Sequence, residues 1–215
     1  MSKGLAKLNE LTISAAVSFL AAIGLKEPFK QLGLLASEQI QSWRFNNLVK
    51  IIAKSAKTCE EHGVKLRNLP NSFTIPFLEA AQNQEDDELQ NIWAALLSNL
   101  VLGNPVHPSY INVIKDLTSI EVRVLLEIYT HYTANQKKYI SKDTYLSLIE
   151  NELLTLSHDN STPLNTNLII GNLQRLNLLR FVMKNNVSQV EITSYAIDLI
   201  HTCKKFDEKF VDLTI

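Results

Sequence analysis

The stretch EDDELQNIWAALLSNL (residues 85–100) contains the clearest structural signal in the chain. Its apolar residues follow the helical spacing i, i+3, i+4, i+7, i+8 and i+11, at Leu89, Ile92, Trp93, Leu96, Leu97 and Leu100. Four carboxylates, Glu85 to Glu88, precede this stripe, where they oppose the positive end of a helix dipole. We interpret them as a solvated helix start rather than a Mg²⁺ or Ca²⁺ site, because adjacent helical residues point to different faces.

Three helices are predicted on the N-terminal side of this stretch, and the last is a short one from Thr74 to Gln82. Pro28 opens a long helix from Phe29 to about His62, and Gly63 ends it. An earlier helix covers about Leu5 to Ile23 and overlaps an uncharged run from Leu11 to Leu25. A membrane span needs about 20 apolar residues. We therefore expect this helix to pack in the core, and the alternative is an interfacial or conditional membrane segment.

On the C-terminal side, Gly103, Asn104, Pro105 and Pro108 form the strongest helix-breaking cluster. We place a domain boundary there. The predicted organisation is an N-terminal helical domain over residues 1–106, a second domain over 107–206 and a tail over 207–215.

Beyond the boundary, the pattern predicts three main helices, a β-hairpin and a last helix. Thr118 and Glu121 form a capping box that begins the first of these helices. Two short apolar runs, Leu178–Met183 and Val187–Ile192, are joined across an Asn pair that tolerates a tight turn. This order resembles a winged-helix domain. The predicted fold class is mainly α: an N-terminal helical domain followed by a winged-helix-like α+β domain with a short β-hairpin.

Composition and charge exclude several classes of protein. Hydrophobic residues make up 46% of the chain and charged residues 20%, which is ordinary globular usage. The formal net charge is −1, so the chain as a whole has no long-range attraction for nucleic acid or anionic lipid. Two cysteines, Cys59 and Cys203, without a secretory pattern indicate reduced thiols in a cytoplasmic protein.

The motifs of common enzymes and cofactor sites are missing from the sequence. None of the five histidines stands at a metal-ligand spacing such as HExxH, and no CxxC is present. GxGxxG, GxxxxGK[ST] and GxSxG are also missing. Cys59 and Cys203 each have a nearby histidine, but no third group that would orient it. We therefore expect no enzyme activity, no metal and no cofactor.

The predicted winged helix raises the question of DNA binding. Its third helix and hairpin contain Arg175, Arg180 and Lys184 against Glu191, a small positive surplus. Asn172 and Gln174 are expected on the exposed side of the helix, where they suit adenine edges or a polar protein surface. Because phosphate binding needs more cations, a structural or protein-binding wing is favoured, and a DNA reader is the alternative.

Several segments share a pattern of helix-packing and capping residues: Glu88 to Gln90, Trp93 to Asn99, His107 to Tyr110, Ile114 to Thr118, and Glu121. Together they resemble the abortive infection alpha family of bacterial phage-defence proteins. The family pattern is an acidic turn, a W-A-x-L-L helix, and a His-Pro that opens a short helix before a Leu-Ser/Thr-x-x-Glu cap. The resemblance is good over about residues 43–127 and looser to 203. Val122 stands where the family would have Ala.

The resemblance implies a role in anti-phage defence and carries over no catalytic residue. A non-enzymatic helical protein can serve there by binding a protein partner, by self-association or by perturbing a membrane. We expect contacts from the exposed sides of the 85–102 helix and from the wing, and we expect His107 to cap or brace the domain junction. The candidate interaction or junction residues are Asn91, Ser98, Asn99, His107, Asn172, Gln174, Arg175, Arg180 and Lys184.

Overall fold

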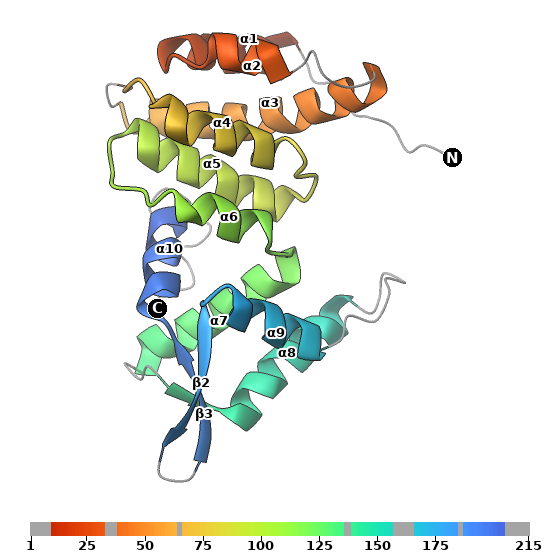
Figure 1. Ribbon diagram of the computed structural model, residues 1–215, viewed down its shortest axis with the longest axis vertical. Coiled ribbons are helices and arrows are strands. Elements are labelled where there is room, and N and C mark those ends of the chain that lie inside the picture. Colours follow the sequence, from red (N-terminus) through yellow and green to blue (C-terminus); the bar gives the residue numbers. More distant parts are fainter. Residues whose placement is uncertain are drawn as a thin grey trace. The chain divides into compact units, whose positions relative to one another are not determined.

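The computed structural model describes residues 10–32, 38–63, 66–135, 139–156, 166–184 and 187–204. Helices predominate in this part of the chain, and a small three-stranded antiparallel sheet accompanies them (Figure 1). The predicted mainly α fold class is confirmed. The chain divides into two compact units, Met1–Asp116 and Leu117–Ile215. The predicted tail over 207–215 lies outside the described residues.

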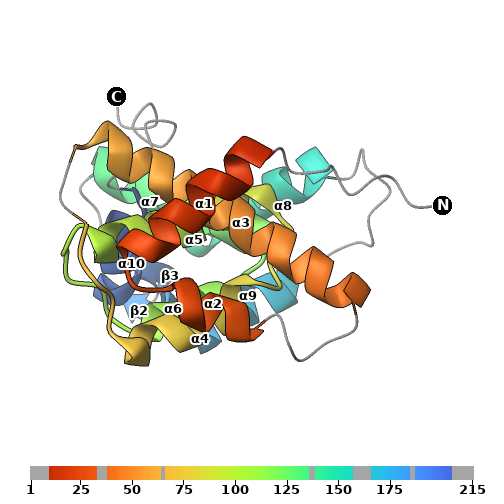
Figure 2. The ribbon, with the colours of Figure 1, turned by 90° about the horizontal axis from the view of Figure 1, so that it is seen from above.

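The described part of the N-terminal unit is helical throughout its regular structure. Its elements are α1 (Glu10–Ala22), α2 (Lys26–Leu32), α3 (Glu38–Glu61), α4 (Asn71–Ala81), α5 (Asp87–Val101) and α6 (Ser109–Lys115). Within this unit, α3 lies between α1 and α5 (Figure 1). Figure 2 shows α1 crossing over α3 at an angle. The range predicted as one helix over 29–62 covers the end of α2 and the whole of α3, and residues 33–37 between them are outside the described part.

The N-terminal helix packs in the core of its unit, as we expected from its short apolar run. Ala16, Leu20 and Ile23 are at most 1% exposed, and α1 contacts α3. Over the residues that the structure describes, no helix combines the length and the apolar character that crossing a membrane requires.

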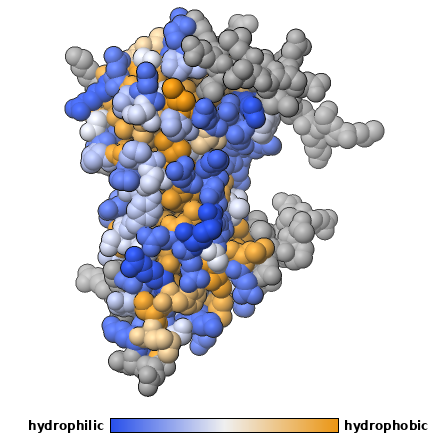
Figure 3. Space-filling view, viewed as in Figure 1, coloured by the Kyte–Doolittle hydropathy of each residue, from blue (hydrophilic) through white to orange (hydrophobic). Residues whose placement is uncertain are grey.

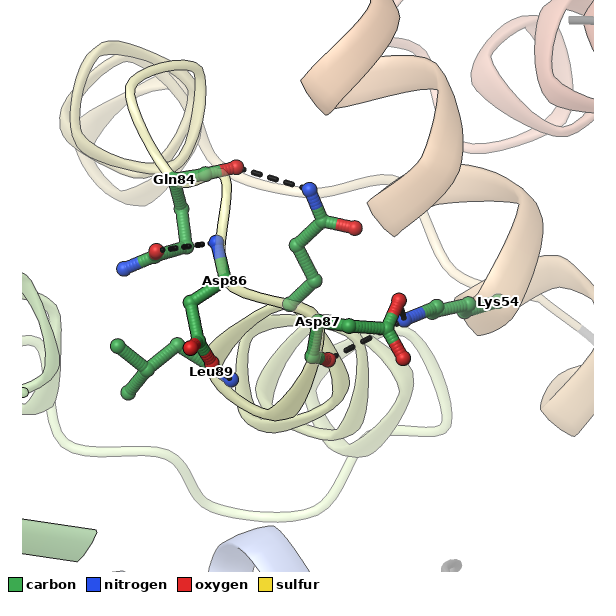
Figure 4. Close-up of polar contacts among 6 residues, drawn as sticks. Lys54, Gln84, Asp86, Asp87 and Leu89 are labelled. Atoms are coloured by element: carbon green, nitrogen blue, oxygen red, sulfur yellow. Dashed lines mark hydrogen bonds and ion pairs between the residues drawn. The ribbon is translucent and has the colours of Figure 1, made fainter. Parts of the chain in front are cut away.

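The acidic run begins α5 as predicted. Asp86 is the N-cap residue, because its Oδ1 accepts a hydrogen bond of 3.0 Å from the backbone N–H of Leu89. The next carboxylate, Asp87, lies 2.7 Å from the Nζ atom of Lys54 on α3 (Figure 4). Gln90 donates from Nε2 to the Gln84 carbonyl at 2.8 Å. These contacts fix the loop before α5 against the helix and against α3.

The boundary between the units falls later in the chain than the helix-breaking cluster suggested. Helix α6 packs on α4 and α5, so it belongs to the N-terminal unit and not to a domain beginning at 107. The turn over 103–108 sends the chain back, and Tyr110, Ile111 and Ile114 are buried as a result. A run of breakers marks a turn, but the apolar face that follows it decides which core the chain joins.

The C-terminal unit combines helices with the small sheet. Its elements are α7 (Ser119–Asn135), β1 (Tyr139–Ser141), α8 (Lys142–Leu156), α9 (Thr166–Arg175), β2 (Leu179–Lys184), β3 (Val187–Ile192) and α10 (Ser194–Lys204). All strands are antiparallel, in the order β1-β3-β2. The predicted hairpin is confirmed as β2 and β3, paired from Leu179↔Ile192 to Lys184↔Val187. The third strand, β1, was not predicted.

Side-chain caps set the helix starts of this unit. The N–H of Thr118 donates to Glu121 Oε2 at 2.8 Å, and the N–H of Glu121 donates to Thr118 Oγ1 at 3.4 Å, which confirms the capping box. Ser141 and Thr193 accept in the same way at the starts of α8 and α10. The helices cover the sheet face that carries Ile140, Leu179, Val190 and Ile192, all at most 4% exposed.

Candidate interaction surface

Helix α9 turns one face to the core and one to solvent. Ile169 and Leu173 point inward and are at most 2% exposed. The exposed residues lie on the opposite side, at the helical spacing of one face: Asn167, Leu168, Gly171, Gln174 and Arg175. Leu168 on this side is 67% exposed.

Asn172 does not belong to this exposed face, which corrects the expectation from the sequence. Its Nδ2 atom donates to Glu121 Oε1 on α7 at 2.8 Å. Glu121 is 4% exposed, and its other carboxylate oxygen already accepts from Thr118. A buried carboxylate must be hydrogen-bonded, so Asn172 is needed to stabilise the packing of α9 on α7. Its side chain is therefore committed within the unit.

The three cations of the predicted wing region all have partners inside the unit. Arg175 donates from Nε and Nη2 to Asn172 Oδ1, at 3.1 and 2.7 Å. Arg180 reaches Asn177 Oδ1 at 3.3 Å from Nη2. Lys184 Nζ lies 4.5 Å from the ring centroid of Tyr139, a cation–π distance. Each contact is solvent-exposed or peripheral, so the cations keep their charge at the surface while their positions are restrained.

The tip of the hairpin carries exposed apolar side chains. Met183 is 72% exposed and Val187 is 52% exposed. Together with Leu168, these are the most exposed large apolar side chains in the described part of the chain. Figure 3 shows orange patches separated by blue ones in the region of the C-terminal unit where Figure 1 places α9 and the hairpin.

We define the α9–hairpin surface as the exposed residues of these two elements. They are Asn167, Leu168, Gly171, Gln174 and Arg175 on α9, and Arg180, Met183, Lys184 and Val187 on the hairpin. Of the residues predicted for an interaction in this unit, it keeps Gln174, Arg175, Arg180 and Lys184. Sequence reasoning missed Leu168, Gly171, Met183 and Val187, because apolar periodicity alone assigns such residues to a core.

The predicted contact residues of α5 are mostly inside the N-terminal unit. Ser98 is fully buried, and its hydroxyl donates to the Ala94 carbonyl at 2.8 Å and lies 2.9 Å from the Ser55 hydroxyl of α3. Asn99 is 1% exposed and donates to the Ala95 carbonyl. These two side chains cannot meet a partner, because helices cover α5 on several sides. Asn91 is half-buried.

His107 lies at the start of α6, where it acts as a local brace. Its Nδ1 atom accepts from the backbone N–H of Ser109 at 3.2 Å and lies 2.6 Å from the Ser109 hydroxyl. The ring also neighbours Tyr110, with centroids 6.1 Å apart. These contacts hold the turn before α6, whose N-cap residue is Pro108, and they all lie in the N-terminal unit.

The described residues offer little for metal or thiolate chemistry. Among them, no three His, Cys, Asp or Glu side chains gather as a metal ion would require. Cys59 is buried beside Ser55 and Ser98, and burial raises the pKa of its thiol above the usual value. Burial also raises the pKa of the Cys203 thiol, to about 12. Both groups are therefore protonated and weakly nucleophilic near neutral pH.

Taken together, fold and surface define a mainly helical protein of two units, one of which presents a mixed apolar and cationic face. A family model for "abortive infection alpha" matches residues 41–213, most of the chain. The chain belongs to the abortive infection alpha family. The match covers the C-terminal unit as far as residue 213, whereas the sequence motifs covered only about residues 43–127 well. No curated protein and no solved structure shows a match to the chain.

Proposed function

We propose that this protein takes part in abortive-infection defence against phage by binding another protein through the α9–hairpin surface, and not by catalysis. Family membership supports the defence role. The observation that carries the mode of action is the exposure of Leu168 on α9 and of Met183 and Val187 on the hairpin, the three most exposed large apolar residues described. Exposed apolar patches are typical of protein-binding sites, and we propose that these side chains serve as one.

A second candidate is a DNA-binding regulator with a winged helix. The order α7-β1-α8-α9-β2-β3 and the sheet order β1-β3-β2 support a winged-helix assignment for the C-terminal unit. Its α9 would then be the recognition helix. The surface carries only three cations, each restrained by a contact within the unit, which is a thin phosphate footprint. Protein binding is therefore the better-supported mode.

A phage plating assay tests the proposal. Cells that express the wild-type chain should show fewer plaques than cells without it for at least one phage of a broad panel. Leu168→Glu and Met183→Glu should abolish that protection, because a charge on the apolar part of the surface opposes docking. Ile75→Glu on α4 is the matched control, since Ile75 is also an exposed apolar side chain, at 45%, but lies in the other unit.

Two outcomes would contradict the proposal. Unchanged plaque numbers across the panel with the wild-type chain would remove the defence role. Protection that survives Leu168→Glu and Met183→Glu at normal protein levels would remove this surface from the mechanism. For the DNA candidate, binding of a mixed-sequence duplex at low salt that weakens steeply with added salt would favour the regulator instead.

A further inference from the structure

The centre of the exposed face of α9 is a glycine that the fold itself does not require. Gly171 is helical, and a Cβ atom built on it would meet nothing within 4 Å. Glycine destabilises a helix interior relative to alanine. Where a glycine serves packing inside its own chain, a neighbouring atom occupies the space that a side chain would fill. At Gly171 that space is open to solvent.

The residues around Gly171 are its neighbours on the helix surface. Positions three and four residues away in each direction are Asn167, Leu168, Gln174 and Arg175, and all four are exposed. Because Gly171 has no side chain, it leaves a gap in the middle of this exposed face. Leu168 lies on one side of the gap and Arg175 on the other. The absence of a side chain at Gly171 allows the backbone of a helix from another protein to approach α9 closely.

The charge of the surface limits what can occupy it. From Thr166 to Ile192 the chain contains three cations and one carboxylate, Glu191, which lies opposite Arg180 in the pairing of β2 with β3, so the surface keeps a positive surplus. A second copy of the same surface would bring these cations together, which disfavours self-association through it. A carboxylate-bearing partner complements the cations, and an apolar stripe on that partner would cover Leu168, Met183 and Val187.

We propose that the α9–hairpin surface binds an acidic amphipathic helix of another protein, which crosses α9 at Gly171. This inference rests on the proposed function for the choice of surface, and it adds the chemistry of the partner and the point of closest approach. Leu168 and the hairpin tip contact the apolar stripe of the partner helix. Arg175, Arg180 and Lys184 face its carboxylates around the rim.

A binding measurement with the full-length protein tests the inference directly. The probe is a fluorescent helical peptide of about 18 residues, long enough to form a helix, with a Leu stripe and Glu at the other positions. A second peptide has Lys in place of every Glu. The Glu peptide should bind about tenfold more tightly than the Lys peptide. Equal binding of the two peptides, or no binding of the Glu peptide, would overturn the inference.

Gly171→Ala provides the sharper test, because it separates binding from stability. The substitution should raise the melting temperature, since alanine favours the helix and meets no neighbour. It should nevertheless weaken binding of the Glu peptide by about tenfold, because the added methyl group holds the partner helix away. Ile75→Ala, at an exposed apolar position of the other unit, should leave the binding unchanged. Undiminished binding by Gly171→Ala would contradict the inference.

Two other occupants of the surface, a second copy of the chain and DNA, would each give a different experimental result. A dimer in sedimentation that Gly171→Ala dissociates would assign the surface to a second copy, and tighter binding of a DNA duplex than of the Glu peptide would assign it to nucleic acid. Either result overturns the acidic partner. If the wild-type chain gave no protection in the plaque assay, that result would contradict the proposed function alone, because peptide binding is measured independently of phage.

Discussion

At the scale of single residues, the glycines differ in two ways: whether the backbone has a positive φ, and whether an added Cβ atom would meet a neighbour. Gly63 has a φ of +58°, and Gly103 has a φ of +83°. A Cβ on Gly63 would meet nothing within 4 Å, as at Gly171, whereas a Cβ on Gly103 would meet the guanidinium of Arg67. Gly63 and Gly171 thus differ in backbone conformation but share open surroundings, which makes them a matched pair.

Gly63→Ala should lower the free energy of unfolding by about 1 kcal/mol, because alanine is strained at positive φ. Gly171→Ala should raise it by about 0.5 to 1 kcal/mol, because the residue is helical. Gly103→Ala should resemble Gly63→Ala, since the end of the Arg67 side chain can swing aside. Urea denaturation measures all three. A loss of stability in Gly171→Ala would show that its surroundings are occupied.

The contact between Asn172 and Glu121 gives a second prediction at this scale. Asn172→Ala leaves a buried carboxylate with one partner fewer, so it should lower the free energy of unfolding by about 1.5 to 3 kcal/mol. Gln174→Ala, on the exposed face of the same helix, should change it by less than about 0.5 kcal/mol. Equal effects of the two substitutions in thermal denaturation would disprove the structural role of Asn172.

At the scale of elements, α1 offers two alanines with opposite surroundings. Ala16 is fully buried in the core of the N-terminal unit, and Ala22 is exposed at the end of α1. Ala16→Arg should destabilise the protein by about 3 kcal/mol or more, because it buries an unpaired charge. Ala22→Arg should be close to neutral. Circular dichroism melting curves distinguish them, and similar curves would mean that α1 does not pack as described.

Elements with a strong local signal were predictable, and those that depend on distant partners were not. The stripe of α5, the capping box at Thr118 and the hairpin turn are each decided within about a dozen residues. Strand β1 is three residues long and exists because it pairs with β3, far away in the sequence. Periodicity cannot reveal so short an element.

The site was predicted less well than the fold, for a related physical reason. Asn172 and Ser98 are polar residues, and polar residues are usually exposed, but each has a buried hydrogen-bond partner on another helix. Leu168 and Met183 are apolar, and the sequence alone assigns such residues to a core. In both cases the environment depends on which elements meet, and this is not encoded in the spacing along one helix.

At the scale of the whole molecule, the two cysteines report on the two units separately. Cys59 belongs to the N-terminal unit and Cys203 to the C-terminal unit. Burial raises both thiol pKa values, so at pH 8 each thiolate fraction is smaller than in an unfolded chain, where the pKa is about 8.5. Both thiols should therefore react slowly with a disulfide reagent in the native protein and quickly in denaturant.

The same shifts predict how stability depends on pH. A raised pKa in the folded state contributes stability that is present below the unfolded pKa and is lost as the pH rises through the folded value. Stability should therefore decrease above about pH 8.5, and Cys59→Ala together with Cys203→Ala should reduce that decrease. Rapid native labelling of Cys59 at pH 8 would contradict the burial of its thiol, which is 3% exposed.

The sheet order has a consequence for synthesis on the ribosome. The central strand β3 is the last of the three to be made, and β1 waits for a partner about fifty residues further along the chain. Until residues 187–192 emerge, β1 and β2 have no strand between them to pair with. The N-terminal unit, by contrast, is complete in sequence at Asp116. The nascent chain should thus carry a folded first unit while β1 and β2 of the second unit are still unpaired.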